Sequence, residues 1–132
     1  MTIQSDNVAV RIGLGRLLSM APLLHLSDDV RGNVEIVLAE VLNNVVEHAY
    51  RDAPGPICIC IDHIDPVVEV SVFDQGAPMP GGHLPAGHPT PIEEVEDLPE
   101  GGFGWFLIRT LTQDLRYERA GEVNRLCFAV QA

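Results

Sequence analysis

The chain has 132 residues, a length typical of one domain with a single hydrophobic core. Its hydrophobic content of 46% indicates a well-filled interior, and a net charge of −11, with eight Arg and no Lys, argues against direct binding of DNA or RNA. Because no apolar run is long enough to span a bilayer and residues 1–10 lack a signal-peptide profile, we expect one domain over residues 1–132, located in the cytoplasm and not in a membrane.

The N-terminal part predicts a strand and two helices. Residues 8–12 alternate in a way that predicts a short strand, and residues 13–25 have helical apolar spacing that Pro22 should kink or end. Ser27 followed by two acidic residues is a typical helix start, and the predicted helix continues to about Tyr50. Its apolar stripe consists of valines three or four residues apart, at Val30, Val34, Val37, Val41 and Val45.

Two strands and a long loop follow. Residues 57–62 and 67–74 are rich in β-branched side chains, and HIDP at 63–66 turns between them as a hairpin. Residues 75–102 hold six of the ten prolines and six of the twelve glycines, which predicts a loop with one helical turn around 92–97. A loop of this length in a compact domain is commonly a functional lid.

The C-terminal part predicts one helix and a second hairpin. Residues 103–114 have helical apolar spacing, and residues 115–130 form two strands around a turn at Ala120–Gly121. The order of elements favours an α+β fold. We expect a two-layer α/β sandwich, with a mixed, mostly antiparallel sheet covered on one face by helices.

Polar residues interrupt the apolar pattern of the long helix. Glu40, Asn44 and His48 are spaced by four, so they lie along one line on the helix surface, with Glu47 beside them. An Asn oxygen can bind Mg²⁺, and a carboxylate can accept a proton. A solvent-exposed helix face commonly carries the same residues, so the helix by itself is a weak signal and leaves both interpretations open.

Asp74 ends the second strand of the first hairpin. Alternation places it on the face of Val68, Val70 and Val72, which should point toward the helices. A buried carboxylate needs a partner, and a base with an exocyclic amine would provide one, while Gly76 would let a ligand approach the backbone closely. An ordinary Asp-x-Gly turn is the alternative.

Gly101, Gly102 and Gly104 lie where the helix after the loop begins. Glycine-rich backbone at a helix N-terminus exposes amide donors and the positive end of the helix dipole, which suits a phosphate group. The motif is neither a Walker loop nor a Rossmann fingerprint. Alone, it would also fit a simple lid hinge.

Taken together, the three motifs resemble the Bergerat-fold (GHKL) ATPases, a superfamily that includes gyrase, the histidine kinases and MutL. The shared order is ExxxN…HAY on a helix, DxGxP after a strand, a variable lid and GGFGWFLI on a helix. Within the superfamily the chain is most similar to the bacterial anti-sigma factor serine kinases, and the likeness covers residues 8–131. One departure is Pro78, which stands where the superfamily usually has the last Gly of D-x-G-x-G.

The resemblance implies ATP or ADP and Mg²⁺ as ligands, with an ATP lid at about residues 77–100. Asn44 would coordinate Mg²⁺, and Glu40 would act as the general base toward a protein serine. The remaining expected binding residues contact the nucleotide: Asp74 would bind the adenine amino group, Gly76 would let the base approach, and Gly102 and Gly104 would surround the phosphates.

The resemblance also implies an activity and partners. The expected protein is an ATP-dependent protein-serine kinase and anti-sigma regulatory factor in transcription regulation. It would phosphorylate a STAS-type antagonist with an acceptor serine and sequester a sigma factor, and a homodimer is compatible with this. The alternatives are a nucleotide-binding switch with little kinase activity and a detached histidine-kinase catalytic domain. The presence of both Glu40 and Asn44 argues against the switch, because a protein that only binds nucleotide does not need the base.

Overall fold

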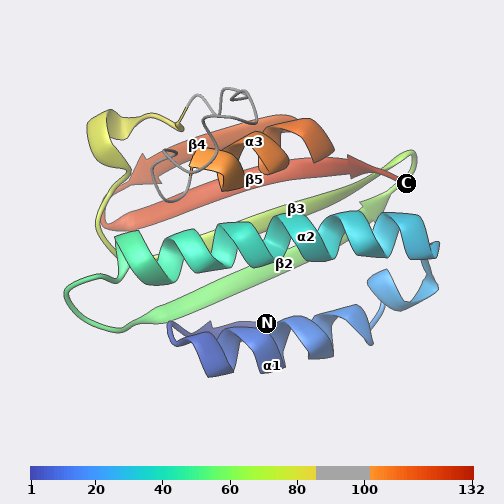
Figure 1. Ribbon diagram of the computed structural model, residues 1–132, viewed down its shortest axis with the longest axis horizontal. Helices are drawn as coiled ribbons and strands as arrows, with labels where there is room; N and C mark the ends of the chain where they lie inside the picture. Colours follow the sequence, from blue (N-terminus) through green and yellow to red (C-terminus); the bar gives the residue numbers. More distant parts are fainter. Residues whose placement is uncertain (86–101) are drawn as a thin grey trace, which may run out of the picture.

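The protein folds as two layers, a sheet with helices packed on one of its faces (Figure 1). The computed structural model describes residues 1–85 and 102–132. The five strands of the sheet have the order β1-β2-β3-β5-β4, and every neighbouring pair is antiparallel. The strands are β1 (Thr2–Gln4), β2 (Pro56–Ile64), β3 (Val67–Asp74), β4 (Gln113–Ala120) and β5 (Val123–Gln131). This confirms the α+β two-layer fold, and the described strands contain none of the parallel pairs that a mixed sheet would have.

Three helices form the second layer. They are α1 (Asn7–Leu18), α2 (Asp28–Asn44) and α3 (Gly102–Leu111). The 3₁₀ turn η1 (Leu23–His25) connects α1 to α2, the π-helical turn η2 (Val45–Ala49) follows α2, and the 3₁₀ turn η3 (Pro80–Gly82) follows β3. Helix α2 crosses the middle of the sheet, with α1 and α3 on its two sides (Figure 1). No helix in the described ranges combines the length and apolarity needed to cross a bilayer.

The strand expected at residues 8–12 is wrong, because these residues lie inside α1. Asp6 caps this helix by accepting a hydrogen bond from the backbone N of Ala9 at 2.8 Å. The short apolar run fits both the strand period and the helix period. The helix forms because it also places Leu17 in the core. The helix ends at Leu18, well before residue 25, and the first strand is instead β1.

The valine stripe of α2 forms the centre of the core, as predicted. Val34, Val37 and Val41 are buried against the helix-facing side of the sheet, where β3 contributes Val68, Val70 and Val72. Full burial of such side chains stabilises a fold by about 1.5–3 kcal/mol each. The helix is therefore held rigidly over the sheet, and its polar residues are held with it.

Both predicted hairpins form. The second one turns at Gly121, whose positive φ of 61° is favourable only for glycine and a few polar residues. In the sheet register, Asp74 at the end of β3 lies opposite Asn124 at the start of β5. Two residues 50 positions apart in the chain thus become direct neighbours.

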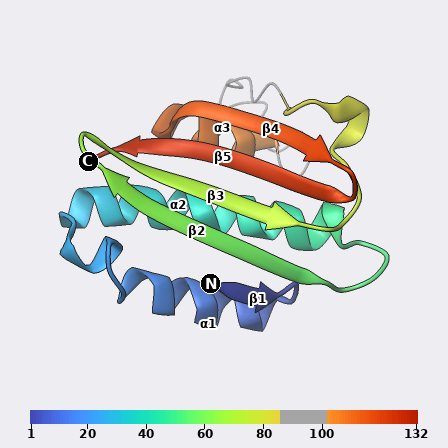
Figure 2. The same ribbon diagram turned by 180° about the vertical axis from the view of Figure 1, so that it is seen from behind.

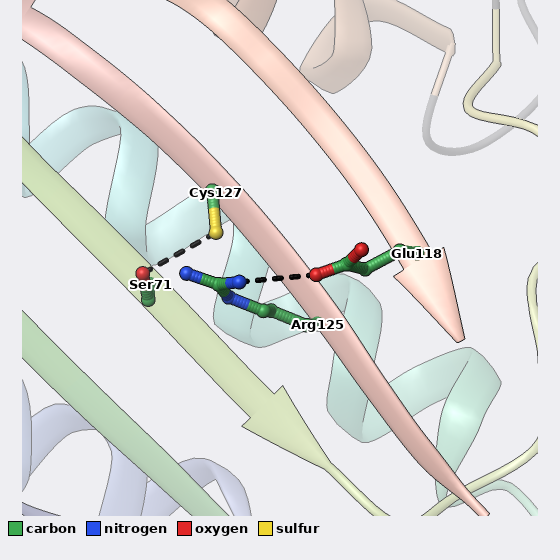
Figure 3. Close-up of polar contacts among 4 residues, drawn as sticks. All are labelled: Ser71, Glu118, Arg125 and Cys127. Atoms are coloured by element: carbon green, nitrogen blue, oxygen red, sulfur yellow. Dashed lines mark hydrogen bonds and ion pairs between the residues drawn. The ribbon is translucent and has the colours of Figure 1, made fainter. Parts of the chain in front are cut away.

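The second face of the sheet carries no helix of the described part of the chain (Figure 2). Polar contacts cross this face: Arg125 pairs with Glu118 at 3.0 Å, and Ser71 shares a 3.3 Å hydrogen bond with the Cys127 thiol (Figure 3). The guanidinium of Arg125 also lies 5.6 Å from the centre of the Phe73 ring. The Arg125–Glu118 ion pair is exposed, so it makes only a small contribution to stability.

Part of the expected lid lies outside the described residues. Residues 77–85 are described and include η3, whereas residues 86–100, with the helical turn expected at 92–97, are not. Gly101 is likewise outside the described residues.

Candidate functional site

A cavity of about 530 Å³ lies between the C-terminal end of α2 and the adjoining ends of β3, β4 and β5. Its size is that of a small-molecule site. Most of its lining is apolar, with a few amide, carboxylate, imidazole and guanidinium groups. The lining residues are Val41, Asn44, Val45, His48, Ala49, Arg51, Val72, Asp74, Ala77, Pro78, Met79, Pro80, Pro85, Trp105, Tyr117, Asn124 and Leu126.

The helical wall of the cavity ends in the π-helical turn η2. Here the backbone N of Tyr50 donates to Val45 O at 3.0 Å, five residues back. A π-turn rotates the following residues relative to a regular α-helix, and such turns are frequent at functional sites. The turn brings His48, Ala49 and Arg51 to the same cavity as Asn44.

Asn44 presents an unpaired amide. Its side chain is only 8% exposed, and its Nδ2 atom is buried with no hydrogen-bond partner among the described residues. A buried amide without a partner costs about 1–3 kcal/mol, so an amide left this way beside a cavity suits a ligand. The amide oxygen of an Asn side chain is also a ligand type that Mg²⁺ accepts.

Asp74 is buried at the end of β3, with 7% of its surface exposed, on the helix-facing side as predicted. Its Oδ1 accepts hydrogen bonds from the backbone N of Gly76 at 2.9 Å and from Asn124 Nδ2 at 2.8 Å. These donors compensate the carboxylate for lost hydration. Asp74 and Asn44 thus come from a strand and a helix to line the same cavity.

Gly76 is not among the residues that line the cavity, and the structure gives it a packing role. A Cβ atom on Gly76 would lie 2.3 Å from the backbone oxygen of Ala49, and the same oxygen accepts a hydrogen bond from the N of Ala77 at 2.8 Å. The loop after β3 therefore passes directly over the end of η2. Glycine is required here by the close approach of two backbones.

Glu40 is placed differently from Asn44. It is half-buried one turn earlier on α2 and is not among the residues that line the cavity. Its carboxylate lies against the first turn of α3, where a Cβ atom on Gly104 would come 2.5 Å from Glu40 Oε2. Gly102 begins the same helix. Gly104 and the Glu40 carboxylate are thus adjacent, next to the cavity that Trp105 of the same helix lines.

Sequence reasoning did not identify several polar residues at or beside the cavity. Asn124 and Tyr117 line the cavity from β5 and β4, and Arg119 donates to Asn124 Oδ1 at 2.9 Å. The one sequence feature that could have indicated Asn124 is the presence of an Asn within a strand, where Asn is depleted. Among the eight Arg residues, all of which are described, Arg51 is the one that lines the cavity, so it is the side chain available there to an anionic group.

Comparison with known proteins decides the family. The family model described as "Histidine kinase-like ATPase domain" matches residues 5–130. The chain belongs to this family. An ATPase domain acts on ATP, so the histidine kinase-like ATPase domain has an ATP-binding site, in agreement with the Bergerat-fold resemblance.

Relatives of this histidine kinase-like ATPase domain include the "Serine-protein kinase RsbW" of Bacillus cereus (strain AH187) and of Bacillus anthracis (strain CDC 684 / NRRL 3495). Each is 33% identical to it over 91 residues, which is 67% of this chain and 56% of the relative. The chain thus matches just over half the length of these relatives.

Solved histidine kinases share the fold of the domain. The histidine kinase domain of the Erythrobacter litoralis EL346 blue-light activated histidine kinase has a TM-score of 0.55 at 17% identity, covering 96% of this chain and 63% of that one. The Acinetobacter baumannii histidine kinase AdeS has a TM-score of 0.51 at 11% identity, covering 99% and 67%. At these identities the likeness concerns the fold alone.

Proposed function

We propose that this domain is an ATP- and Mg²⁺-dependent protein-serine kinase that also acts as an anti-sigma regulatory factor. One observation carries the proposal: the unpaired amide of Asn44 and the carboxylate of Asp74 line one cavity of nucleotide size. Similarity to serine-protein kinases RsbW supports the choice of serine as acceptor. The partners would be a STAS-type antagonist with an acceptor serine and a sigma factor, and the domain would comprise residues 1–132.

The proposed binding roles follow the geometry of the cavity. Asp74 accepts a hydrogen bond from the adenine amino group, and Asn44 holds the Mg²⁺ ion. The protein is acidic and has few cationic side chains, so they cannot neutralise the phosphate charge. Bound Mg²⁺ would neutralise it instead. Arg51 lines the same cavity and is exposed, so it can approach an anionic group of the nucleotide.

The proposed transfer step uses the segment where α2 meets α3. Gly102 and Gly104 open α3, so backbone amides and the positive end of its dipole are available to the phosphates. The bond between the γ-phosphorus and the bridging oxygen to the β-phosphate breaks, a bond from the serine oxygen to the γ-phosphorus forms, and Glu40 takes the hydroxyl proton. ADP and a phosphoserine are the products.

A nucleotide-binding switch remains the second candidate, and one observation favours it. The Glu40 carboxylate rests against Gly104 and does not line the cavity, so the acid is not directed at the cavity in this conformation. A protein that holds nucleotide only to change its affinity for a partner would not need this acid as a base. The two functions therefore differ in what Glu40 does.

The test combines binding with transfer. Calorimetry with ADP and Mg²⁺ measures the affinity of the proposed site for nucleotide. Incubation of γ-labelled ATP with a STAS-type antagonist measures phosphoryl transfer. We expect Glu40→Gln to keep ADP affinity but lower transfer by at least about 10²-fold, and Asp74→Asn to weaken ADP binding itself. Glu35→Gln is the matched control, because it makes the same change on the same helix at a residue outside the cavity.

Each outcome assigns a function. Acid-stable label on the antagonist, lost when its acceptor serine is replaced by alanine, supports the serine kinase. Nucleotide binding with no label on the antagonist favours the switch. Acid-labile label would indicate a histidine kinase domain, and absence of ADP binding would overturn the proposal.

A further inference from the structure

Asn124 lies at the centre of a hydrogen-bond network beside the cavity, and its side chain is almost completely buried. Its Nδ2 donates to Asp74 Oδ1 at 2.8 Å and also lies within hydrogen-bond distance of the carbonyl oxygens of Gly76, at 3.3 Å, and Ala77, at 3.0 Å. Its Oδ1 accepts from the Tyr117 hydroxyl at 2.6 Å and from Arg119 at 2.9 Å. Every hydrogen-bonding atom of this amide therefore has a partner.

The chemistry of its neighbours determines which way the Asn124 amide points. A guanidinium can only donate hydrogen bonds, and a carboxylate can only accept them. The amide oxygen must therefore face Arg119, and the amide nitrogen must face Asp74. The reversed amide would place an oxygen against the Asp74 carboxylate and NH₂ against the guanidinium, which would lose both bonds.

This arrangement leaves one oxygen of Asp74 available. Oδ1 receives two donors, Gly76 N and Asn124 Nδ2, whereas Oδ2 has no hydrogen bond from any residue in the described ranges. Asp74 lines the cavity, so Oδ2 can accept a hydrogen bond from a ligand there. The bonds on Oδ1 hinder rotation of the carboxylate and so keep Oδ2 in place.

The same network reaches the loop after β3. The Tyr117 hydroxyl, which donates to Asn124, accepts a hydrogen bond from the backbone N of Met79 at 3.0 Å. Asn124 itself bonds the carbonyl groups of the two residues before Pro78. The carboxylate and the first residues of the expected lid are thus held by one amide.

We propose that Asn124 is the positioning residue for the Asp74 carboxylate, and that it gives the site its preference for a purine with a 6-amino group over one with a 6-oxo group. The inference rests on the proposed function and extends it to base selectivity. A 6-amino group donates to Oδ2, whereas a 6-oxo group presents lone pairs to a carboxylate that has been fixed in place. Loss of Asn124 frees the carboxylate to rotate or take up water, and selectivity falls.

The experiment compares ADP with inosine diphosphate, each with Mg²⁺, by calorimetry. The parent protein should prefer ADP by at least about tenfold. Asn124→Ala should reduce this preference by about tenfold, through weaker ADP binding with little change for inosine diphosphate. Tyr117→Phe keeps the ring and removes the hydroxyl that helps orient the amide, so it should reduce the preference by a smaller factor.

Controls separate selectivity from damage to the fold. Asn43→Ala makes the same chemical change at an exposed position that does not line the cavity and should leave both affinities unchanged. Thermal unfolding of each variant shows whether it is folded. If Asn124→Ala keeps the parent's preference, or if both variants weaken the two nucleotides equally, the inference is overturned while the proposed function stands. If the parent binds neither nucleotide, the proposed function is overturned, and the inference with it.

Discussion

The carboxylate of Glu40 lies against the backbone of Gly104, with room for a hydrogen atom but not for a methyl group. A Cβ atom there would come 2.5 Å from Glu40 Oε2 and 3.3 Å from its carboxyl carbon. The contact joins α2, which carries Asn44, to α3, which begins at Gly102. It therefore connects the proposed base with the proposed phosphate site.

Gly104→Ala tests this contact. The added methyl group meets the end of a flexible side chain, so the carboxylate can move away at little cost to folding. We expect the midpoint of thermal unfolding to change little, ADP affinity to stay within a few-fold, and phosphoryl transfer to fall by at least about tenfold as the proposed base is displaced. Unchanged transfer would show that the position of Glu40 does not matter.

Asn44→Ala should affect ligand binding much more than folding. Because Nδ2 makes no hydrogen bond among the described residues, its removal relieves a desolvation cost that offsets the lost packing. We expect the free energy of unfolding without ligand to change by less than about 1 kcal/mol. Affinity for ADP with Mg²⁺ should fall at least about tenfold, and EDTA should no longer weaken binding as it does in the parent. Denaturant unfolding and calorimetry measure the two effects, and a large loss of stability would contradict this prediction.

Gly76→Ala and Gly15→Ala form a matched pair with opposite outcomes. A methyl group on Gly76 would overlap the backbone of Ala49, so the first variant should lose about 1–3 kcal/mol of unfolding free energy. Gly15 lies within α1 with open space around it, and alanine there should add about 0.5–1 kcal/mol. Urea unfolding of both proteins checks the signs. Equal effects would mean that the loop does not pack on η2 as described.

The Cys60 thiol should react slowly at neutral pH. Desolvation, and then the neighbouring Cys58 thiol, raise the pKa of Cys60 above its ordinary value. A raised thiol pKa means less reactive thiolate at a given pH, so alkylation by iodoacetamide should be slower than for a free cysteine at pH 7–8 and should keep increasing above the ordinary thiol pKa. Cys58→Ser removes one cause of the shift and should move the pH profile toward lower pH. A profile that is already flat at pH 8 would contradict this.

Local patterns were sufficient to predict most of the fold. The valine stripe of α2 and the two hairpins follow from spacings within a single element, and Asp74 was correctly placed on the buried face. Residues 8–12 were assigned wrongly because five residues fit both the helical and the strand period. In that segment the cap at Asp6 and the apolar residues further along decide the outcome.

The site depends on relations that the sequence does not display. Asn44 and Asp74 could each be selected from a motif, but the importance of Asn124 depends on the register that places it opposite Asp74. An Asn within a strand is unusual, but this local signal does not say which residue lies opposite it. The π-helical turn that brings Arg51 to the cavity is equally invisible, because residues 45–49 continue the helical pattern of α2.

Tyr50 joins the end of the helix to β2 and to the residue that follows β3, since its hydroxyl donates to Pro56 O at 2.6 Å and accepts from the backbone N of Gln75 at 2.7 Å. Gly55 lies so close that a side chain there would overlap the phenol ring. These contacts hold the end of the helix against the sheet beside the cavity, and they do not require a bound ligand. Release of a bound ligand should then depend on the loop of residues 77–85, and the dissociation rate should respond to substitutions in that loop more than to substitutions at helix residues that do not line the cavity.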